Sequence, residues 1–143
     1  MNSKKPLYTV PVPSTSFVTE AYWDGAGVSP AIRFSYEKAG VNYRGGIVFE
    51  RVLAARERAE RCCKAWHIEG AYDTLVEIEG SPWVEEMRGD TAEQWRSKWE
   101  MHHYMIYLDS AGCFEVIAES WQAARGGSSP TAGEARGQAR GQA

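Results

Sequence analysis

A histidine and several polar partners share one face of a predicted β-hairpin, and their side-chain types could support acid–base chemistry. The hairpin spans His102–Trp121. Its turn, Asp109-Ser110-Ala111-Gly112, has aspartate at the first position and glycine where a left-handed backbone is favoured, which indicates a type I turn with a G1 bulge. If residues 110–112 form the loop, His103 lies opposite Glu119. A carboxylate beside an imidazole orients the ring and favours its protonated form, as in a prepared general base.

This register divides the hairpin into two faces of different character. One face is apolar and carries Leu108, Ile106, Phe114 and Val116. The other face holds the candidate catalytic residues His103, Glu119, Tyr107 and Glu115. It either lines a pocket in a closed or strongly curved sheet, or faces solvent, where a His–Glu pair is worth under about 1 kcal/mol. Antiparallel sheets commonly leave one face solvated, which favours the solvent interpretation. Met105, Ile117 and Trp121 keep the pocket open as an alternative, because a purely solvated face would not need them.

Metal, cofactor and nucleic-acid sites are not predicted. All the histidines and cysteines lie between residues 62 and 113, but the only close pair is Cys63 and His67. No CxxC or HxxxH pattern occurs, and His102 and His103 point to opposite faces of a strand, so zinc lacks its usual ligand spacing. There is no phosphate-binding glycine motif, and the basic stretch 51–64 lacks interleaved aromatic residues. We therefore expect no metal, no cofactor and no nucleic-acid partner.

The composition is that of a soluble globular protein with an unusual aromatic content. The chain has 143 residues, 43% of them apolar, and a formal net charge of -3, so it can bury a core and has no global field that attracts anionic partners. Six Trp, seven Tyr and four Phe indicate either aromatic-rich packing or an aromatic-lined cavity. The odd number of cysteines, together with the lack of a signal peptide, favours a cytoplasmic protein. We expect no membrane partner, because no apolar run is long enough to span a membrane.

One globular domain is predicted over residues 17–124. Residues 1–16 are rich in Pro, Ser and Thr, which is typical of a flexible segment. Residues 125–143 contain only small and polar side chains and repeat Ala-Arg-Gly-Gln, so we expect a disordered tail that cannot offset its ordering entropy.

The predicted elements form an α+β, β-rich domain built on antiparallel hairpins, as a curved sheet or a small barrel. Alternating side chains predict strands near 32–36, 41–49 and 72–79, beside the hairpin. Ser81-Pro82 and the capping box at Thr91 predict two short helices near 82–100. Residues 49–66 fit either a helix with an apolar stripe or a long strand, and the pattern leaves both open.

These features favour a small cytoplasmic, bacterial binding or accessory protein. It would present an aromatic-rich surface or cavity to a protein partner or an apolar small molecule. The residues expected to contact that ligand are Trp121, Met105, Ile117, Trp99 and His67. The alternative is a cofactor-independent enzyme of the isomerase or cyclase type. It would act on a hydrophobic substrate with a His–carboxylate pair inside a β-rich cup.

Overall fold

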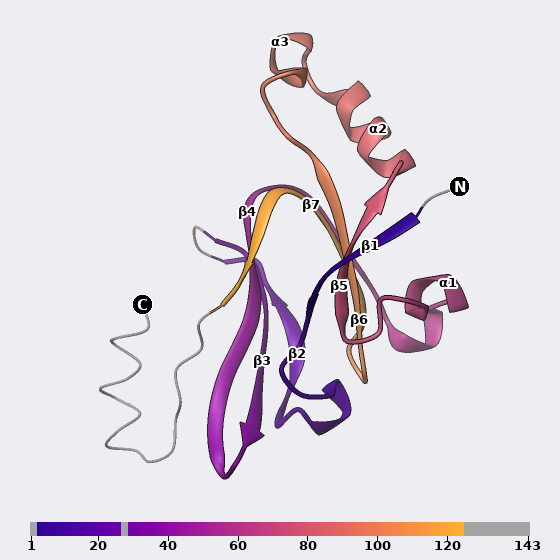
Figure 1. The fold of residues 1–143 in the computed structure, drawn as a ribbon. Coiled ribbons are helices and arrows are strands. Elements are labelled where there is room, and N and C mark those ends of the chain that lie inside the picture. Colours follow the sequence, from indigo (N-terminus) through magenta and orange to yellow (C-terminus); the bar gives the residue numbers. More distant parts are fainter. Residues whose placement is uncertain (1–2, 27–28, 125–143) are drawn as a thin grey trace.

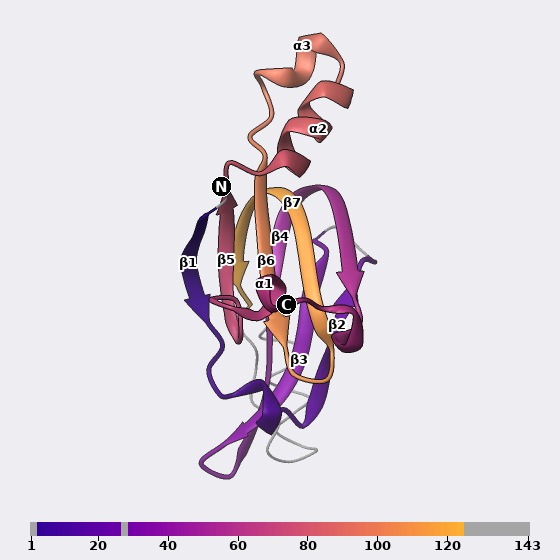
Figure 2. The same cartoon turned by 90° about the vertical axis from the view of Figure 1, so that its right-hand side faces the viewer.

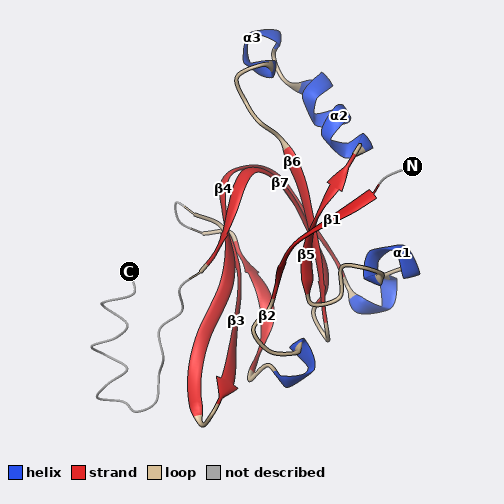
Figure 3. Cartoon of the chain, in the orientation of Figure 1, coloured by secondary structure: helices blue, strands red, loops and turns tan. Residues whose placement is uncertain are grey.

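The protein forms one open, seven-stranded antiparallel sheet with a few short helices (Figures 1 and 3). The computed structural model describes residues 3–26 and 29–124. The strands are β1 (Ser3–Thr9), β2 (Thr19–Asp24), β3 (Ala31–Lys38), β4 (Val41–Arg58), β5 (Thr74–Glu79), β6 (His102–Leu108) and β7 (Gly112–Ala123). The helices are η1 (Ser14–Ser16), η2 (Glu60–Cys62), α1 (Ala65–Ile68), α2 (Pro82–Asp90) and α3 (Glu93–Arg96). The strand order is β1-β5-β6-β7-β4-β3-β2, so among the described residues β1 and β2 are the outermost strands and no barrel closes. The β-rich antiparallel prediction is confirmed, with α2 and α3 as the two short helices near 82–100.

The long strand β4 joins the two halves of the sheet. Its first part, 41–48, pairs with β3, and its second part, 47–58, pairs with β7. A bulge between Val52 and Ala54 and a positive φ of 54° at Arg51 mark where the strand bends. For the segment 49–66 the strand interpretation therefore holds as far as Arg58, followed by η2 and α1. The Ala, Leu, Arg and Glu residues of this stretch favour a helix, but propensity contributes little per residue, and the backbone pairing with β7 outweighs it.

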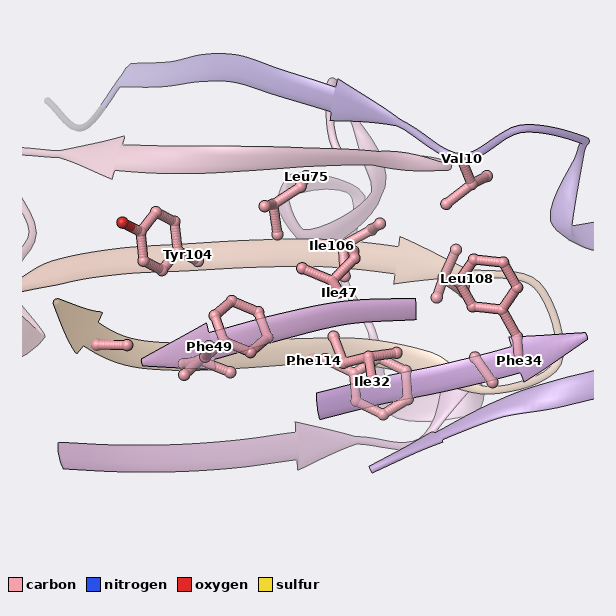
Figure 4. Close-up of a cluster of buried hydrophobic side chains, with 13 residues drawn as sticks. Val10, Ile32, Phe34, Ile47, Phe49, Leu75, Tyr104, Ile106, Leu108 and Phe114 are labelled. Atoms are coloured by element: carbon pink, nitrogen blue, oxygen red, sulfur yellow. The ribbon is translucent and has the colours of Figure 1, made fainter. Parts of the chain in front are cut away.

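The main core lies between the two halves of the bent sheet (Figure 4). Its buried members are Val10, Ala21, Ile32, Phe34, Ile47, Phe49, Leu75, Tyr104, Ile106, Leu108, Phe114, Val116 and Ala118. The apolar face of the predicted hairpin contributes the last six of these. Its burial confirms the alternation of side chains along β6 and β7.

The second face of β6 and β7 is covered as well. Two smaller apolar clusters lie on it. One is formed by Ala71, Val76, Ile78, Met105, Tyr107 and Cys113, and the other by Val84, Met101 and Ile117. Helices α1 and α2 both contact β6, and in Figures 1 and 2 α2 and α3 extend beyond one end of the sheet. The apolar side chains on this face therefore pack in clusters beneath the helices, and the face is buried rather than solvated.

The register of the hairpin differs from the predicted one by two residues. Leu108 pairs with Gly112 and His103 pairs with Ile117, so the prediction that His103 lies opposite Glu119 is wrong. The loop consists of residues 109–111, and Ser110 takes the left-handed conformation, with φ of 68°. A shift of two keeps each side chain on its face, because the side-chain period of a strand is two.

Glycine at position 112 is required by strand packing rather than by the loop. Gly112 is the first residue of β7 and has φ of 102°. A Cβ atom there would lie 2.1 Å from the carbonyl oxygen of Arg58, at the end of β4. The turn prediction took this glycine for a loop residue, because the sequence does not show the approach of a third strand.

The N-terminal segment belongs to the sheet. Ser3–Thr9 pairs with β5 along its length, although residues 1–16 were expected to be flexible and outside the domain. The pairing shifts register between Pro6 and Tyr8, and proline is tolerated at such bulges on edge strands. The predicted tail, 125–143, lies outside the described residues. Within the described chain, no helix is both long and apolar enough to cross a bilayer.

Candidate functional site

A buried imidazole–carboxylate pair lies on the helix-covered face of the sheet. The Nε2 atom of His103, on β6, is 2.8 Å from Oε1 of Glu115, on β7. His103 is 3% exposed and Glu115 is 2% exposed. Glu115 pairs directly with Met105, so the two side chains meet diagonally across the strands. His103 thus contacts a carboxylate of the neighbouring strand, but that carboxylate is Glu115 rather than the predicted Glu119.

Arg56 provides a positive charge beside the carboxylate of Glu115. It lies opposite Glu115 on β4, and its Nε and Nη2 atoms are each 3.1 Å from a carboxylate oxygen, as a bidentate fork. The guanidinium carbon lies 3.8 Å from the ring centre of Trp83. Burial alone would raise the pKa of Glu115, but the hydrogen bonds from His103 and Arg56 outweigh it and lower that pKa to about 2. Glu115 is therefore ionised at neutral pH despite its burial.

Ser81 links the pair to helix α2. Its Oγ atom is 2.7 Å from Nδ1 of His103 and also accepts a hydrogen bond from the backbone N–H of Val84, as the predicted N-cap. Because Oγ accepts from Val84, its own hydrogen is free to donate to Nδ1. The imidazole therefore bridges the two groups, with Nδ1 bonded to Ser81 and Nε2 bonded to the ionised carboxylate of Glu115. The sequence identified Ser81 as a cap only, since nothing in its spacing indicates the histidine.

Hydrogen bonds link the side chains of Ser81, His103 and Glu115 in a row, which we call the buried chain. Its residue types are those of a nucleophile, a base and an orienting carboxylate. Ser81 is 5% exposed, and its partners are more deeply buried still. Both imidazole nitrogens are occupied by protein groups, and Trp83 packs edge-on against the ring at 5.1 Å. As it stands, this buried chain fastens the first turn of α2 to the sheet and leaves no nitrogen for a substrate.

The other two candidate catalytic residues lie elsewhere. Glu119 pairs with Arg51 at 3.4 Å in a partly exposed contact. The hydroxyl group of Tyr107 donates to Oε2 of Glu60 at 3.0 Å, and burial followed by this hydrogen bond raises the pKa of the phenol. Of the four predicted residues, the structure brings His103 and Glu115 into contact.

The five residues predicted to contact a ligand are spread over the molecule. Trp121 packs on the main core, while Met105 and Ile117 are fully buried in the two smaller clusters. Trp99 stacks on Trp95 with ring centres 5.8 Å apart, beyond α3. His67, on α1, accepts a hydrogen bond from the backbone of the preceding turn. These five side chains do not surround a common cavity.

A pocket of about 210 Å³ lies on the opposite side of the sheet from the buried chain. Its lining residues are Trp23, Ala55, Arg56, Glu57, Phe114, Glu115 and Val116. The pairs Ala55–Val116 and Glu57–Phe114 alternate with Arg56–Glu115 along β4 and β7. Because successive side chains point to opposite faces, Arg56 and Glu115 present mainly backbone to this pocket. We call it the Trp23 pocket.

Trp23 forms the wall of this pocket opposite β4. It lies on β2, pairs with Ile32, and its ring is 6.1 Å from that of Phe49 in the core. A Cβ atom at Gly25 would lie 2.9 Å from the indole Nε1, so the glycine allows the ring to fold back over the chain. Sequence reasoning missed Trp23, because only the overall count of aromatic residues pointed to a cavity and no periodic pattern includes this tryptophan.

Comparisons with protein families, curated proteins and solved structures found no match for this chain. Two features of the described residues could serve a function, the buried chain and the Trp23 pocket.

Proposed function

We propose that the protein binds a small apolar molecule in the Trp23 pocket. The observation that carries this proposal is the pocket itself, whose side chains from β2, β4 and β7 include Trp23, Phe114 and Val116. Pockets for small molecules are typically concave, largely apolar and provided with a few polar groups. An apolar cavity of roughly 150 Å³ holds benzene, so about 210 Å³ accommodates a ligand of one ring or a short branched chain.

Binding fits the structure better than acid–base catalysis does. Phe114 and Val116 are buried at the base of the pocket, whereas Ala55 is exposed at its mouth. A ligand can therefore enter from solvent and cover apolar surface without displacing a protein group. His103, by contrast, uses both nitrogens within the protein.

The free thiols support a reducing compartment. Cys62, Cys63 and Cys113 are all unbridged, and thiols persist in reduced form in the cytoplasm. We take the cytoplasm as the proposed location.

Protein-observed NMR tests the proposal with toluene as a neutral probe. The indole N–H signal of Trp23, assigned with Trp23→Phe, should shift on titration, and Trp23→Ala should abolish binding. Trp95→Ala is the matched control, because Trp95 is an exposed tryptophan that stacks on Trp99 away from the pocket. If the Trp23 signal is unmoved at millimolar toluene, the pocket does not bind apolar molecules.

The second candidate is the cofactor-independent enzyme, with Glu115 in place of Glu119 as the carboxylate partner. The observation that favours it is the continuous chain from Ser81 through His103 to Glu115. A catalytic role requires α2 to move, because Ser81 occupies Nδ1 in the structure. A fluorophosphonate probe, which labels base-activated serines, should then modify Ser81 in the wild type but not in His103→Gln. Without labelling of the folded wild type, the chain is purely structural.

A further inference from the structure

We infer that the ligand of the Trp23 pocket carries a positive charge: a primary or substituted ammonium group on a small apolar body. This inference rests on the proposed binding function and specifies its ligand class. It is carried by one carboxylate at the mouth of the pocket and by aromatic rings beside it.

Glu57 is the charged side chain that faces the pocket. It pairs with Phe114 on β7, and the alternation along β4 places its carboxylate on the same side as Ala55. It is exposed and has no ion pair or hydrogen bond with the described part of the chain. A negative charge without a partner at a pocket mouth attracts cations and repels anions.

The arginines next to Glu57 are committed to other groups. Arg56 points to the opposite face, where it holds Glu115 and covers Trp83. Arg58 donates to the carbonyl oxygen of Cys62 at 3.3 Å. Neither guanidinium therefore neutralises the carboxylate of Glu57, so a cationic ligand would meet it unpaired.

The aromatic walls add a second attraction for a cation. Trp23 and Phe114 both line the pocket, and the face of an aromatic ring attracts ammonium groups, most strongly for tryptophan. The cation–π contacts of the described residues involve Trp66, Trp83 and Trp95, so none of them occupies Trp23.

The exposure gradient orients the ligand. Phe114 and Val116 are buried at the base, and Ala55 and Glu57 are exposed at the rim. An amphiphilic cation would place its apolar body against the base and its ammonium group beside Glu57, where it remains partly hydrated. This arrangement avoids the cost of burying an unpaired charge.

Titrations of the full chain with three probes of one shape test the inference. Benzylammonium, benzyl alcohol and benzoate differ in charge but share the ring and nearly the same volume. At pH 7 and low salt, benzylammonium should bind about five- to tenfold more tightly than benzyl alcohol, as an ion pair and a cation–π contact at a partly exposed site would give. Benzoate should bind most weakly, and added salt should reduce the preference for the cation.

Glu57→Gln is the decisive variant, with Glu50→Gln as its matched control. Both glutamates are exposed on β4, but Glu50 is not among the residues that line the pocket. Glu57→Gln should bring the affinity for benzylammonium down to that for benzyl alcohol and leave the latter unchanged. Glu50→Gln should preserve the preference.

The failure of this inference can be distinguished from failure of the binding proposal. If benzyl alcohol or benzoate shifts the Trp23 signal at concentrations as low as benzylammonium does, the ligand is not selected for positive charge, although the pocket binds apolar molecules. The same conclusion follows if Glu57→Gln retains the preference for benzylammonium. If none of the probes, toluene included, moves the Trp23 signal, the proposed function itself is wrong.

Discussion

Replacing Glu115 by glutamine should destabilise the protein by an amount that depends on pH. The side chain keeps its shape but loses the charge that accepts bonds from His103 and from Arg56. The pKa of Glu115 is about 2 in the folded protein, against 4.5 for the free side chain. The folded state therefore binds fewer protons than the unfolded state within this window. The ionised carboxylate contributes on the order of 3 kcal/mol of stability above pH 4.5, and this contribution is lost as the pH falls towards 2.

Urea unfolding followed by circular dichroism measures this effect. At pH 7, Glu115→Gln should lower the free energy of unfolding by about 3 kcal/mol, since the loss of a buried charge partner is costly. Between pH 4.5 and pH 2 the difference between wild type and variant should shrink, because protonation makes the wild-type side chain neutral too. Arg56 is half exposed, so water can solvate it in the variant and limit the loss.

Glu119→Gln is the control for the same chemical change on the same strand. Its carboxylate pairs with Arg51 at 3.4 Å near the surface, so the change should alter stability by less than about 1 kcal/mol at any pH. A stability difference between wild type and Glu115→Gln that stays constant from pH 7 to pH 2 would show that the charge of Glu115 does not stabilise the fold. Equal behaviour of the two glutamine variants would show the same.

Three further substitutions test the contacts that hold helix α2 and the hairpin. Ser81→Ala should cost about 1–2 kcal/mol in urea unfolding, because the N–H of Val84 loses its cap and the imidazole of His103 loses a hydrogen-bond partner; an unchanged midpoint would contradict this. Gly112→Ala should destabilise by several kcal/mol or prevent folding, since its Cβ would meet the carbonyl of Arg58 at 2.1 Å in a backbone with positive φ. Gly89→Ala is the counterpart, because no atom lies within 4 Å of its Cβ inside helix α2, and it should gain up to about 1 kcal/mol in the same measurement.

Local patterns in the sequence were sufficient for the faces of the strands and the start of helix α2. The capping box predicted at Thr91 is wrong, because Thr91 ends α2 and α3 begins at Glu93 with Ala92 as its N-cap. The alternation from His102 to Leu108 predicted which side chains share a face, and Ser81-Pro82 predicted the start of α2. Both rest on contacts within a few residues of the chain, so a single sequence contains the information.

Which carboxylate contacts His103 could not be read from neighbouring residues, because it depends on the pairing of strands. A shift of two residues in the hairpin register keeps each side chain on its face but changes the residue opposite it on the neighbouring strand. The shift accompanies the position of Gly112, which is the first residue of β7 and packs against the backbone of Arg58 instead of lying in the loop. Glu115 was among the predicted residues, but its hydrogen bonds to His103 and Arg56 depend on the pairing of three strands, β4, β7 and β6, which the sequence does not show.

The sequence by itself determined a β-rich antiparallel domain, a hairpin with two distinct faces and a histidine with carboxylates near it. The tertiary structure decided that helices cover the second face, that β4 continues as a strand to Arg58, and that Trp23 approaches β7 to form a pocket. The physical reason is the range of the interactions. Side-chain alternation and helix capping depend on residues a few positions apart. The pocket and the buried chain instead require contacts between residues twelve or more positions apart, and only the packing of the whole domain selects these contacts.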